Sequence, residues 1–169
     1  MIAGTVTNTS RTTSDPGLAC ALANWLAAVS PEEGRVAFVR VLLADDNAGV
    51  LAYVALRLRK AFQVIGTVED GQAAVDAVLR LDPDVVVLDV SMPVLNGFQA
   101  AACLRDAKCR TKIVILTIFE DSEYIAAAFS SGASAYVSKR HLTTDLETAI
   151  RAVIRGNTFI SPSMAQLEA

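Results

Sequence analysis

The chain of 169 residues is predicted to fold as an open, doubly wound α/β domain with five parallel strands. From Val36 onwards, short β-branched and aliphatic runs alternate five times with longer amphipathic segments, and brief polar turns separate them. A run such as Val85 to Leu88 is apolar without alternation, which suits a strand covered by helices on both faces. Hydrophobic residues make up 53% of the chain and charged residues 20%, a balance typical of a globular domain.

The elements are placed in chain order by the polar turns that end each apolar run. Strands are expected at Val36–Ala44, Gln63–Val68, Val85–Asp89, Ile113–Thr117 and Ala135–Val137. Helices are expected between and after them, at Ala48–Ala61, Gly71–Leu81, Gly97–Ala107, Ser122–Ser131 and Thr143–Arg155. In open sheets of this kind, ligands bind at the carboxyl ends of the strands, so functional residues are expected there.

The domain is expected to span residues 36–162, with an extension before it and a short tail after it. Residues 1–35 form the extension, in which the Thr- and Ser-rich stretch 1–17 has little apolar surface to bury and is predicted to be flexible. Leu18–Val29 is apolar enough for a short helix. Residues 163–169 are interpreted as a tail, or as the start of a linker to a further domain.

Composition excludes several classes of function. The formal net charge of −3 and the lack of a basic cluster argue against a nucleic-acid-binding surface. Cys20, Cys103 and Cys109 are odd in number and lack a CxxC pairing, so neither a disulfide framework nor a zinc site is indicated. The apolar stretches are shorter than the roughly 20 residues of a membrane span, and no cationic signal region begins the chain. A cytoplasmic location is expected.

Three carboxylates are predicted to meet at one edge of the sheet. Asp45 and Asp46 end the first strand, and Asp89 ends the third. Unpaired, these acids would repel one another, and at least one would tend to be protonated. A bound Mg²⁺ resolves the repulsion, because this ion prefers oxygen ligands and is commonly held by one or two carboxylates. The alternative is that they are solvated acids at the ends of helices.

Two further strand ends add a hydroxyl and a cation to the same edge, at Thr117 and Lys139. An acyl phosphate on Asp89 would carry negative charge on its oxygens, which a metal ion, an ammonium group and a hydroxyl can stabilise together. Alone, such a Thr is usually an ordinary strand residue and such a Lys a solvated charge. Their shared location indicates phosphoryl chemistry.

At this point the sequence resembles the receiver domains of bacterial two-component response regulators. The resemblance rests on four motifs in the family's order, and it covers about Val36 to Pro162. The motifs are the acidic-pair strand Val41–Asn47, the phosphoacceptor loop Leu88–Gly97, the Thr-containing strand end Ile115–Thr117 and the Lys-containing segment Gly132–Lys139. The resemblance implies a flavodoxin-like (βα)5 fold.

The resemblance also implies roles for the residues that bind the metal and the phosphoryl group. Asp89 would be the nucleophile and phosphoacceptor. Asp46 and the backbone carbonyl of Ser91 would bind Mg²⁺ directly together with Asp89, and Asp45 would bind it directly or through water. Lys139 would contact the phosphoryl oxygens. The protein is then not an enzyme, beyond catalysing its own phosphorylation and dephosphorylation.

The switch residues implied by the resemblance are Thr117 and Tyr136. Thr117 would move toward the phosphate when Asp89 is modified, and the ring of Tyr136 would move inward with it. Considered alone, Tyr136 reads as an ordinary aromatic residue of a sheet. The surface expected to respond is 120–144, which would support dimerisation or partner docking. A sensor histidine kinase would donate the phosphoryl group.

The end of the match, Ala149–Pro162, resembles the NarL/FixJ subfamily, in which this segment leads to a DNA-binding helix-turn-helix domain. The seven residues after Pro162 are too few for such a domain, so no nucleic-acid contact is expected from this chain. Two interpretations stay open, a receiver cut from a longer transcription factor and a stand-alone receiver. The first is favoured by the subfamily resemblance.

Two other functions are possible for a fold of this kind. A haloacid-dehalogenase-like phosphatase would need an acid at position 91, which is Ser. A pseudo-receiver or flavin-binding module would use the fold without phosphorylation, but the complete set of acids, Thr and Lys speaks against it.

Phe119, two residues after Thr117, is expected to limit water access and to slow self-dephosphorylation. His141 is interpreted as a solvent-exposed loop residue.

Overall fold

A computed structural model of the chain describes residues 38–165, and Phe38 begins the compact unit to which they belong. The predicted extension at residues 1–35 and its short helix lie outside the described residues, as do residues 166–169 of the predicted tail. None of the helices in the described part of the chain has the length and apolar character needed to cross a bilayer.

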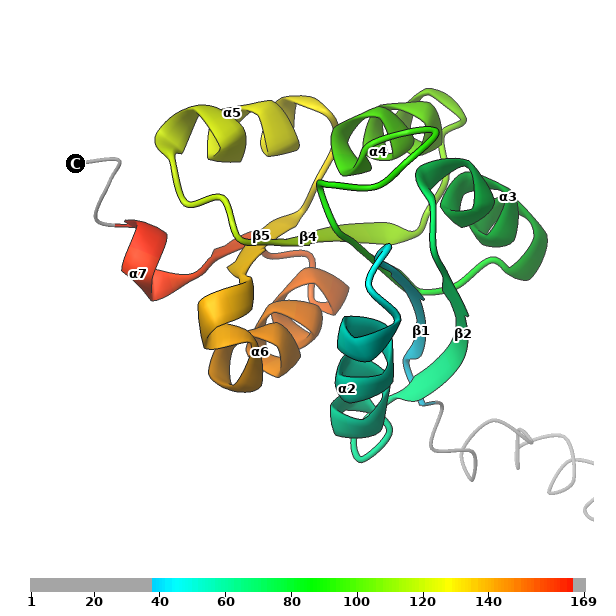
Figure 1. Cartoon of the computed structure of the whole chain (residues 1–169), viewed down its shortest axis with the longest axis horizontal. Coiled ribbons are helices and arrows are strands. Elements are labelled where there is room, and N and C mark those ends of the chain that lie inside the picture. Colours follow the sequence, from blue (N-terminus) through cyan, green and yellow to red (C-terminus); the bar gives the residue numbers. More distant parts are fainter. Residues whose placement is uncertain (1–37, 166–169) are drawn as a thin grey trace, which may run out of the picture. The chain divides into compact units, whose positions relative to one another are not determined.

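The strands form one sheet in the order β2-β1-β3-β4-β5-β6, and all neighbouring pairs are parallel (Figure 1). Their bounds are β1 Arg40–Ala44, β2 Gln63–Val68, β3 Val85–Leu88, β4 Lys112–Thr117, β5 Ala135–Ser138 and β6 Phe159–Ile160. The doubly wound parallel architecture is confirmed. The strand order reverses between β1 and β3, because the chain leaves β1 toward β2 and then returns to β3 on the other side.

The prediction of five strands is wrong by one, since β6 is a sixth. This strand has only two residues, too few to give a periodic pattern, and it forms by pairing with β5 through the backbone. The short helix that follows it, α7 at Pro162–Ala165, was also missed. The first strand begins at Arg40 rather than Val36, and Phe38 and Val39 are not part of it.

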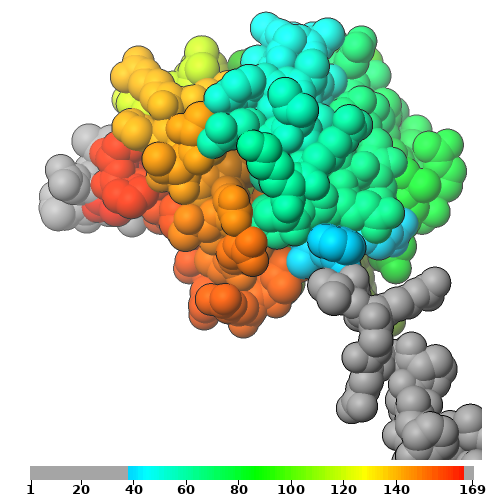
Figure 2. Space-filling model, turned by 90° about the horizontal axis from the view of Figure 1, so that it is seen from below, coloured from blue at the N-terminus to red at the C-terminus, as the bar shows by residue number. Residues whose placement is uncertain are grey.

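Helices cover both faces of the sheet. α2 and α6 lie on one face, and α3, α4 and α5 lie on the other (Figure 1). Figure 2 looks onto the first face and shows α2 and α6 side by side. The helix bounds are α2 Ala48–Leu58, α3 Gly71–Leu81, α4 Gly97–Asp106, α5 Ser122–Ser130 and α6 Leu142–Ile154, with a 3₁₀ turn η1 at Lys139–His141. Four of these five helices end one to three residues before the predicted positions, and α3 ends at the predicted residue.

The strand residues alternate between two apolar cores, one on each side of the sheet. Leu42, Val86 and Ile115 pack against α3, α4 and α5 on one side. Val41 and Val87 pack against α2 and α6 on the other. Both faces of the central strands are thus fully buried, and their polar residues stand only at the strand ends.

Side-chain caps start the helices that follow β1 and β3, α2 directly after Asp46 and α4 after the loop that begins at Asp89. Asn47 accepts hydrogen bonds from two amides of the first turn of α2. Asn96 and Gln99 form a reciprocal capping box at the start of α4. The carboxylates of Asp45, Asp46 and Asp89 lie between each strand and its capped helix, at the sheet edge.

Candidate functional site

The candidate site lies at the carboxyl ends of β1 and β3, which are neighbours at the point where strand order reverses. Asp45 follows β1 and Asp89 follows β3, and the Asp89 amide donates a hydrogen bond of 2.9 Å to the carbonyl of Ala44. Both carboxylates are almost fully buried, at 3% and 4% exposure. Two adjacent parallel strands therefore carry two buried acids side by side.

A third acid completes a carboxylate cluster. Asp46 is exposed, and one oxygen from each of Asp45, Asp46 and Asp89 can be chosen so that all three lie within 4.8 Å of one another. Three acid oxygens at this spacing fit a hard cation such as Mg²⁺, which accepts few protein ligands and completes its shell with water. The sequence prediction placed the same three residues together.

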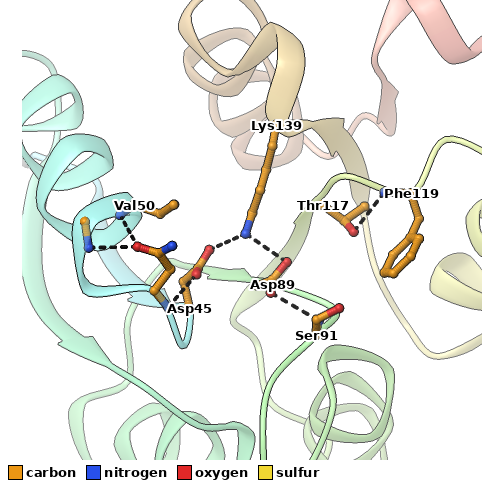
Figure 3. Close-up of polar contacts among 9 residues, drawn as sticks. Asp45, Val50, Asp89, Ser91, Thr117, Phe119 and Lys139 are labelled. Carbon is orange, nitrogen blue, oxygen red and sulfur yellow. Dashed lines mark hydrogen bonds and ion pairs between the residues drawn. The ribbon is translucent and has the colours of Figure 1, made fainter.

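Lys139 links the two buried acids. Its Nζ lies 2.6 Å from Asp45 Oδ2 and 3.1 Å from Asp89 Oδ1 (Figure 3). The remaining carboxylate oxygens accept backbone hydrogen bonds, of 2.9 Å from the Asn47 amide to Asp45 and of 3.1 Å from the Ser91 amide to Asp89. One ammonium group thus offsets part of the charge of three carboxylates, and the site keeps an excess of negative charge.

Burial and charge shift the ionisation of this cluster in opposite ways. Burial raises the pKa of Asp89 above its ordinary value, and the nearby Lys139 ammonium only partly offsets this. Burial alone would lower the pKa of Lys139, but its hydrogen bonds and ion pairs with Asp45 and Asp89 raise it above its ordinary value. Lys139 is therefore a cation at neutral pH, and Asp89 takes up a proton more easily than an ordinary Asp carboxyl.

Thr117 ends β4, the strand next to β3, and its side chain is fully buried. The Phe119 amide donates a hydrogen bond of 3.3 Å to Thr117 Oγ1. In Figure 3, Thr117 lies between Asp89 and Phe119. The hydroxyl is thus held by its own loop in this structure, within the same sheet edge as the acids.

Tyr136 lies on β5 with its ring fully buried among the residues of the core that faces α3, α4 and α5. Its hydroxyl donates a hydrogen bond of 3.0 Å to the Phe119 carbonyl. Burial raises the pKa of Tyr136, so its hydroxyl stays protonated. Because a carbonyl oxygen only accepts hydrogen bonds, the Tyr136 hydroxyl is the donor. The same short loop therefore contacts both Thr117 and Tyr136.

A family model described as the response regulator receiver domain matches residues 41–151, which is most of the chain and runs from the second residue of β1 into α6. The chain belongs to this family. Receivers are signalling switches that catalyse their own phosphorylation and generally bind Mg²⁺ in an acidic pocket.

Two regulatory proteins illustrate the receiver's relatives. The uncharacterized transcriptional regulatory protein YvfU of Bacillus subtilis is 34% identical over 128 residues, which are 75% of this chain and 64% of YvfU. The oxygen regulatory protein NreC of Staphylococcus carnosus is 34% identical over 129 residues, 75% of this chain and 59% of NreC. The chain thus spans about three fifths of the length of these relatives.

Solved receivers have the same architecture. A LuxR-family response regulator from Aurantimonas is 31% identical with a TM-score of 0.72, and the match covers 77% of this chain and 94% of that protein. The receiver domain of the putative response regulator NarL from Mycobacterium tuberculosis is 27% identical with a TM-score of 0.69, over 71% and 98% of the two chains. The receiver is therefore of the NarL/LuxR type.

The sequence did not predict a second polar cluster beside the receiver site. Glu120 accepts a hydrogen bond of 2.6 Å from Ser138 Oγ and one of 3.3 Å from Arg140. It ties the β4–α5 connection to the end of β5, next to Lys139. No local pattern signals this cluster, because its members lie about twenty positions apart and each looks like an ordinary surface residue.

The two residues that flank the site, Phe119 and His141, each contact a neighbouring element. Phe119 stacks on Tyr124, with ring centroids 4.6 Å apart, so its ring is held by α5. His141 is exposed as predicted, but it ends the 3₁₀ turn η1 instead of lying in an irregular loop, and its Nδ1 lies 3.3 Å from Ser163 Oγ.

The phosphoacceptor loop is shaped by one glycine and one strained residue. A Cβ at Gly97 would collide with the backbone carbonyl of Asp89, so only glycine lets α4 start this close to the acid. Val94 has φ +68°, in the left-handed region that β-branched residues rarely adopt, and its side chain is 75% exposed. The loop between these residues is thus a tight, strained turn.

Proposed function

We propose that this receiver is a cytoplasmic switch that takes a phosphoryl group onto Asp89 and changes its surface around residues 120–144. The observation that carries the proposal is the bridge of Lys139 across Asp45 and Asp89, at the strand-end edge where three carboxylate oxygens lie within 4.8 Å. This arrangement combines a nucleophile, a metal-binding cluster and a fixed cation, which are the groups that phosphoryl transfer requires.

The phosphoryl donor is proposed to be a phosphohistidine of a sensor kinase. An Asp89 carboxylate oxygen attacks the phosphorus, the P–N bond breaks, and its electron pair returns to the imidazole nitrogen, which then takes up a proton. When bound, Mg²⁺ would neutralise charge on the phosphoryl oxygens. Asp45, Asp46, Asp89 and the Ser91 carbonyl would hold it.

Lys139 and Thr117 are proposed to stabilise the product. The Lys139 ammonium lies 3.1 Å from Asp89 Oδ1 and would pair with the phosphoryl oxygens once Asp89 becomes a mixed anhydride. Thr117 would leave the Phe119 amide and donate its hydroxyl proton to another phosphoryl oxygen. Because the Phe119 carbonyl also accepts from Tyr136, a move of this loop would shift Tyr136 and the surface formed by residues 120–144.

A groove beside the site offers a docking place for the donor. It measures about 420 Å³ and lies between the start of α2 and the η1–α6 segment, where Val50, Tyr53 and Leu142 give it an apolar wall and Lys139 and Arg140 a basic one. Tyr53 is 47% exposed, and Figure 2 shows the face on which α2 and α6 meet. An apolar surface next to the acceptor fits a helix carrying the phosphohistidine.

The output is proposed to be transcription regulation. The relatives named as transcriptional or oxygen regulatory proteins extend well beyond the region matched here. A phosphorylation-dependent change in residues 120–144 would then control dimerisation or the activity of a DNA-binding domain joined after this receiver. Nucleic-acid contact is not assigned to the receiver itself.

Intact mass spectrometry tests the phosphoacceptor directly. The full chain is incubated with Mg²⁺ and phosphoramidate, and in parallel the Asp89→Asn variant is treated alike. A single phosphoryl adduct is expected for the wild type, dependent on the metal and absent from the variant, because an amide is not a nucleophile of this kind. No adduct in folded wild-type protein would instead favour a receiver fold that binds partners without phosphorylation.

A further inference from the structure

The short segment after α6 contacts the strand that leads into Lys139. β6 pairs with β5, and Ser161, fully buried, follows β6 directly. The Ser161 amide donates a hydrogen bond of 3.0 Å to the Tyr136 carbonyl, and the Ser138 amide donates one of 3.1 Å to Ser161 Oγ. Ser161 therefore holds the last residues of β5 from its open edge.

The bond to Ser161 Oγ replaces a missing strand partner. β6 ends at Ile160, so no strand backbone is left to accept from the Ser138 amide, which belongs to a fully buried residue. A buried amide without an acceptor is costly, and the Ser161 hydroxyl satisfies it. The next residue along the chain is Lys139, whose ammonium group reaches Asp45 and Asp89.

From this geometry we propose that Ser161 is a positioning residue for Lys139 in the phosphorylation of Asp89. It fixes the backbone immediately before Lys139, and that backbone sets where the ammonium group enters the site. The inference rests on the proposed function, since it assigns Ser161 to the same reaction. Ser161 lies outside the region matched by the family model, residues 41–151.

Further contacts hold Ser161 itself in place. Its carbonyl accepts a hydrogen bond of 2.8 Å from the Met164 amide, which closes the turn of α7. The Met164 side chain is fully buried in the same core as Tyr136. The segment is thus packed as part of the domain. By thermodynamic linkage, phosphorylation would in turn change how firmly this segment is held.

The first test measures the rate of adduct formation on the full chain with phosphoramidate and Mg²⁺. Ser161→Ala removes the acceptor, and the rate at saturating donor is expected to fall about fivefold, the value of one neutral hydrogen bond. Ser161→Thr keeps a hydroxyl and is expected to retain most of the rate. Ser163→Ala removes an exposed hydroxyl two residues further along, in α7, and serves as the matched control, with an unchanged rate.

A double-mutant cycle decides whether Ser161 acts through Lys139. In a Lys139→Ala background, Ser161→Ala is expected to have no further effect on the rate, because the group it positions is gone. Equal effects of Ser161→Ala in both backgrounds, or a wild-type rate in Ser161→Ala, would overturn the inference. Should Ser161→Ala unfold, Ser161→Cys, which offers only a weak sulfur acceptor, is expected to lower the rate, and a wild-type rate would overturn the inference. Failure of the proposed function is distinguishable, since the wild type would then form no adduct.

Discussion

The two halves of the receiver site are built from different kinds of contact. On the β1–β3 side, Asp45 and Asp89 are held by backbone amides two residues further along the chain, those of Asn47 and Ser91. On the β4–β5 side, the Tyr136 hydroxyl contacts a residue 17 positions away, and Ser138 contacts Glu120 18 positions away. The first half is fixed by its own turns, and the second by side chains that join separate loops.

This difference fits the proposed division between chemistry and response. The proposed nucleophile Asp89 and the acids around it need a geometry that does not change during the reaction, and short backbone contacts supply it. A switch needs contacts that can be exchanged for others of similar free energy, and hydrogen bonds between loops are suited to this. Lys139 joins the halves, because it stands at the end of β5 and pairs with both acids of the other side.

Replacing Thr117 with Ala tests whether the halves can be separated, and its effect on the response is expected to be the largest. The adduct on Asp89 should still form, at a rate within about tenfold of wild type, because one hydroxyl contact is lost. The structural change of residues 120–144 on phosphorylation should disappear. Amide chemical shifts recorded with and without phosphoramidate report both the formation of the adduct and this structural change. If residues 120–144 of Thr117→Ala still change on phosphorylation, the response does not pass through this hydroxyl.

Replacing Phe119 with Glu tests the role of the switch half in the lifetime of the adduct. The carboxylate would draw water toward the acyl phosphate, while the wild-type ring is apolar and stacked on Tyr124. The phosphorylated state is expected to decay about threefold to tenfold faster in Phe119→Glu, within the range of modest general-base effects. Decay is followed by intact mass after removal of the donor. A wild-type lifetime shorter than that of the variant would contradict the shielding role of Phe119.

Replacing Asp89 with Asn tests how much the buried Asp89 carboxylate lowers the free energy of unfolding, and the expected effect is the smallest of the three. Burial raises the pKa of Asp89 in the folded chain, so its ionised form lowers stability at neutral pH. Without Mg²⁺, Asp89→Asn is expected to be about 1 kcal/mol more stable than wild type at pH 7. Lys139 keeps its pair with Asp45 in this variant.

The pH dependence of that difference supplies the control. As pH falls through the folded-state pKa of Asp89 toward its unfolded value, the folded wild type takes up the proton and loses the penalty. The stability gap between the variant and wild type is therefore expected to shrink on acidification. Urea unfolding at several pH values measures it. A gap that widens at low pH would mean that the ion pair with Lys139 outweighs the burial of Asp89.

The strand-end residues could be predicted from the sequence because each is marked locally. Asp45, Asp89 and Thr117 directly follow or end apolar runs, and parallel strands bring such positions to one edge of the sheet. Their convergence needed only the order of strands and helices. The resemblance to receivers supplied the roles, and the family and fold are confirmed by the comparisons.

The remaining contacts could not be predicted because they depend on tertiary packing. β6 is two residues long, and no local pattern marks Ser161 after it as a partner for β5. Glu120 reads as a solvated acid, yet it bonds to Ser138. Side chains of this kind take their partners from the folded sheet, and a single sequence carries no periodic signal for them.

The bridge made by Lys139 also has a consequence during synthesis of the protein. Asp45 and Lys139 are separated by 139 − 45 = 94 positions, although their charged groups lie 2.6 Å apart. A growing chain on the ribosome carries both Asp45 and Asp89 long before Lys139 emerges. Until β5 has been added, the nascent chain lacks the cation of the site, so a kinase meeting an unfinished chain would find a poor acceptor. On the proposed function, phosphorylation is thereby confined to molecules whose sheet has been assembled through β5.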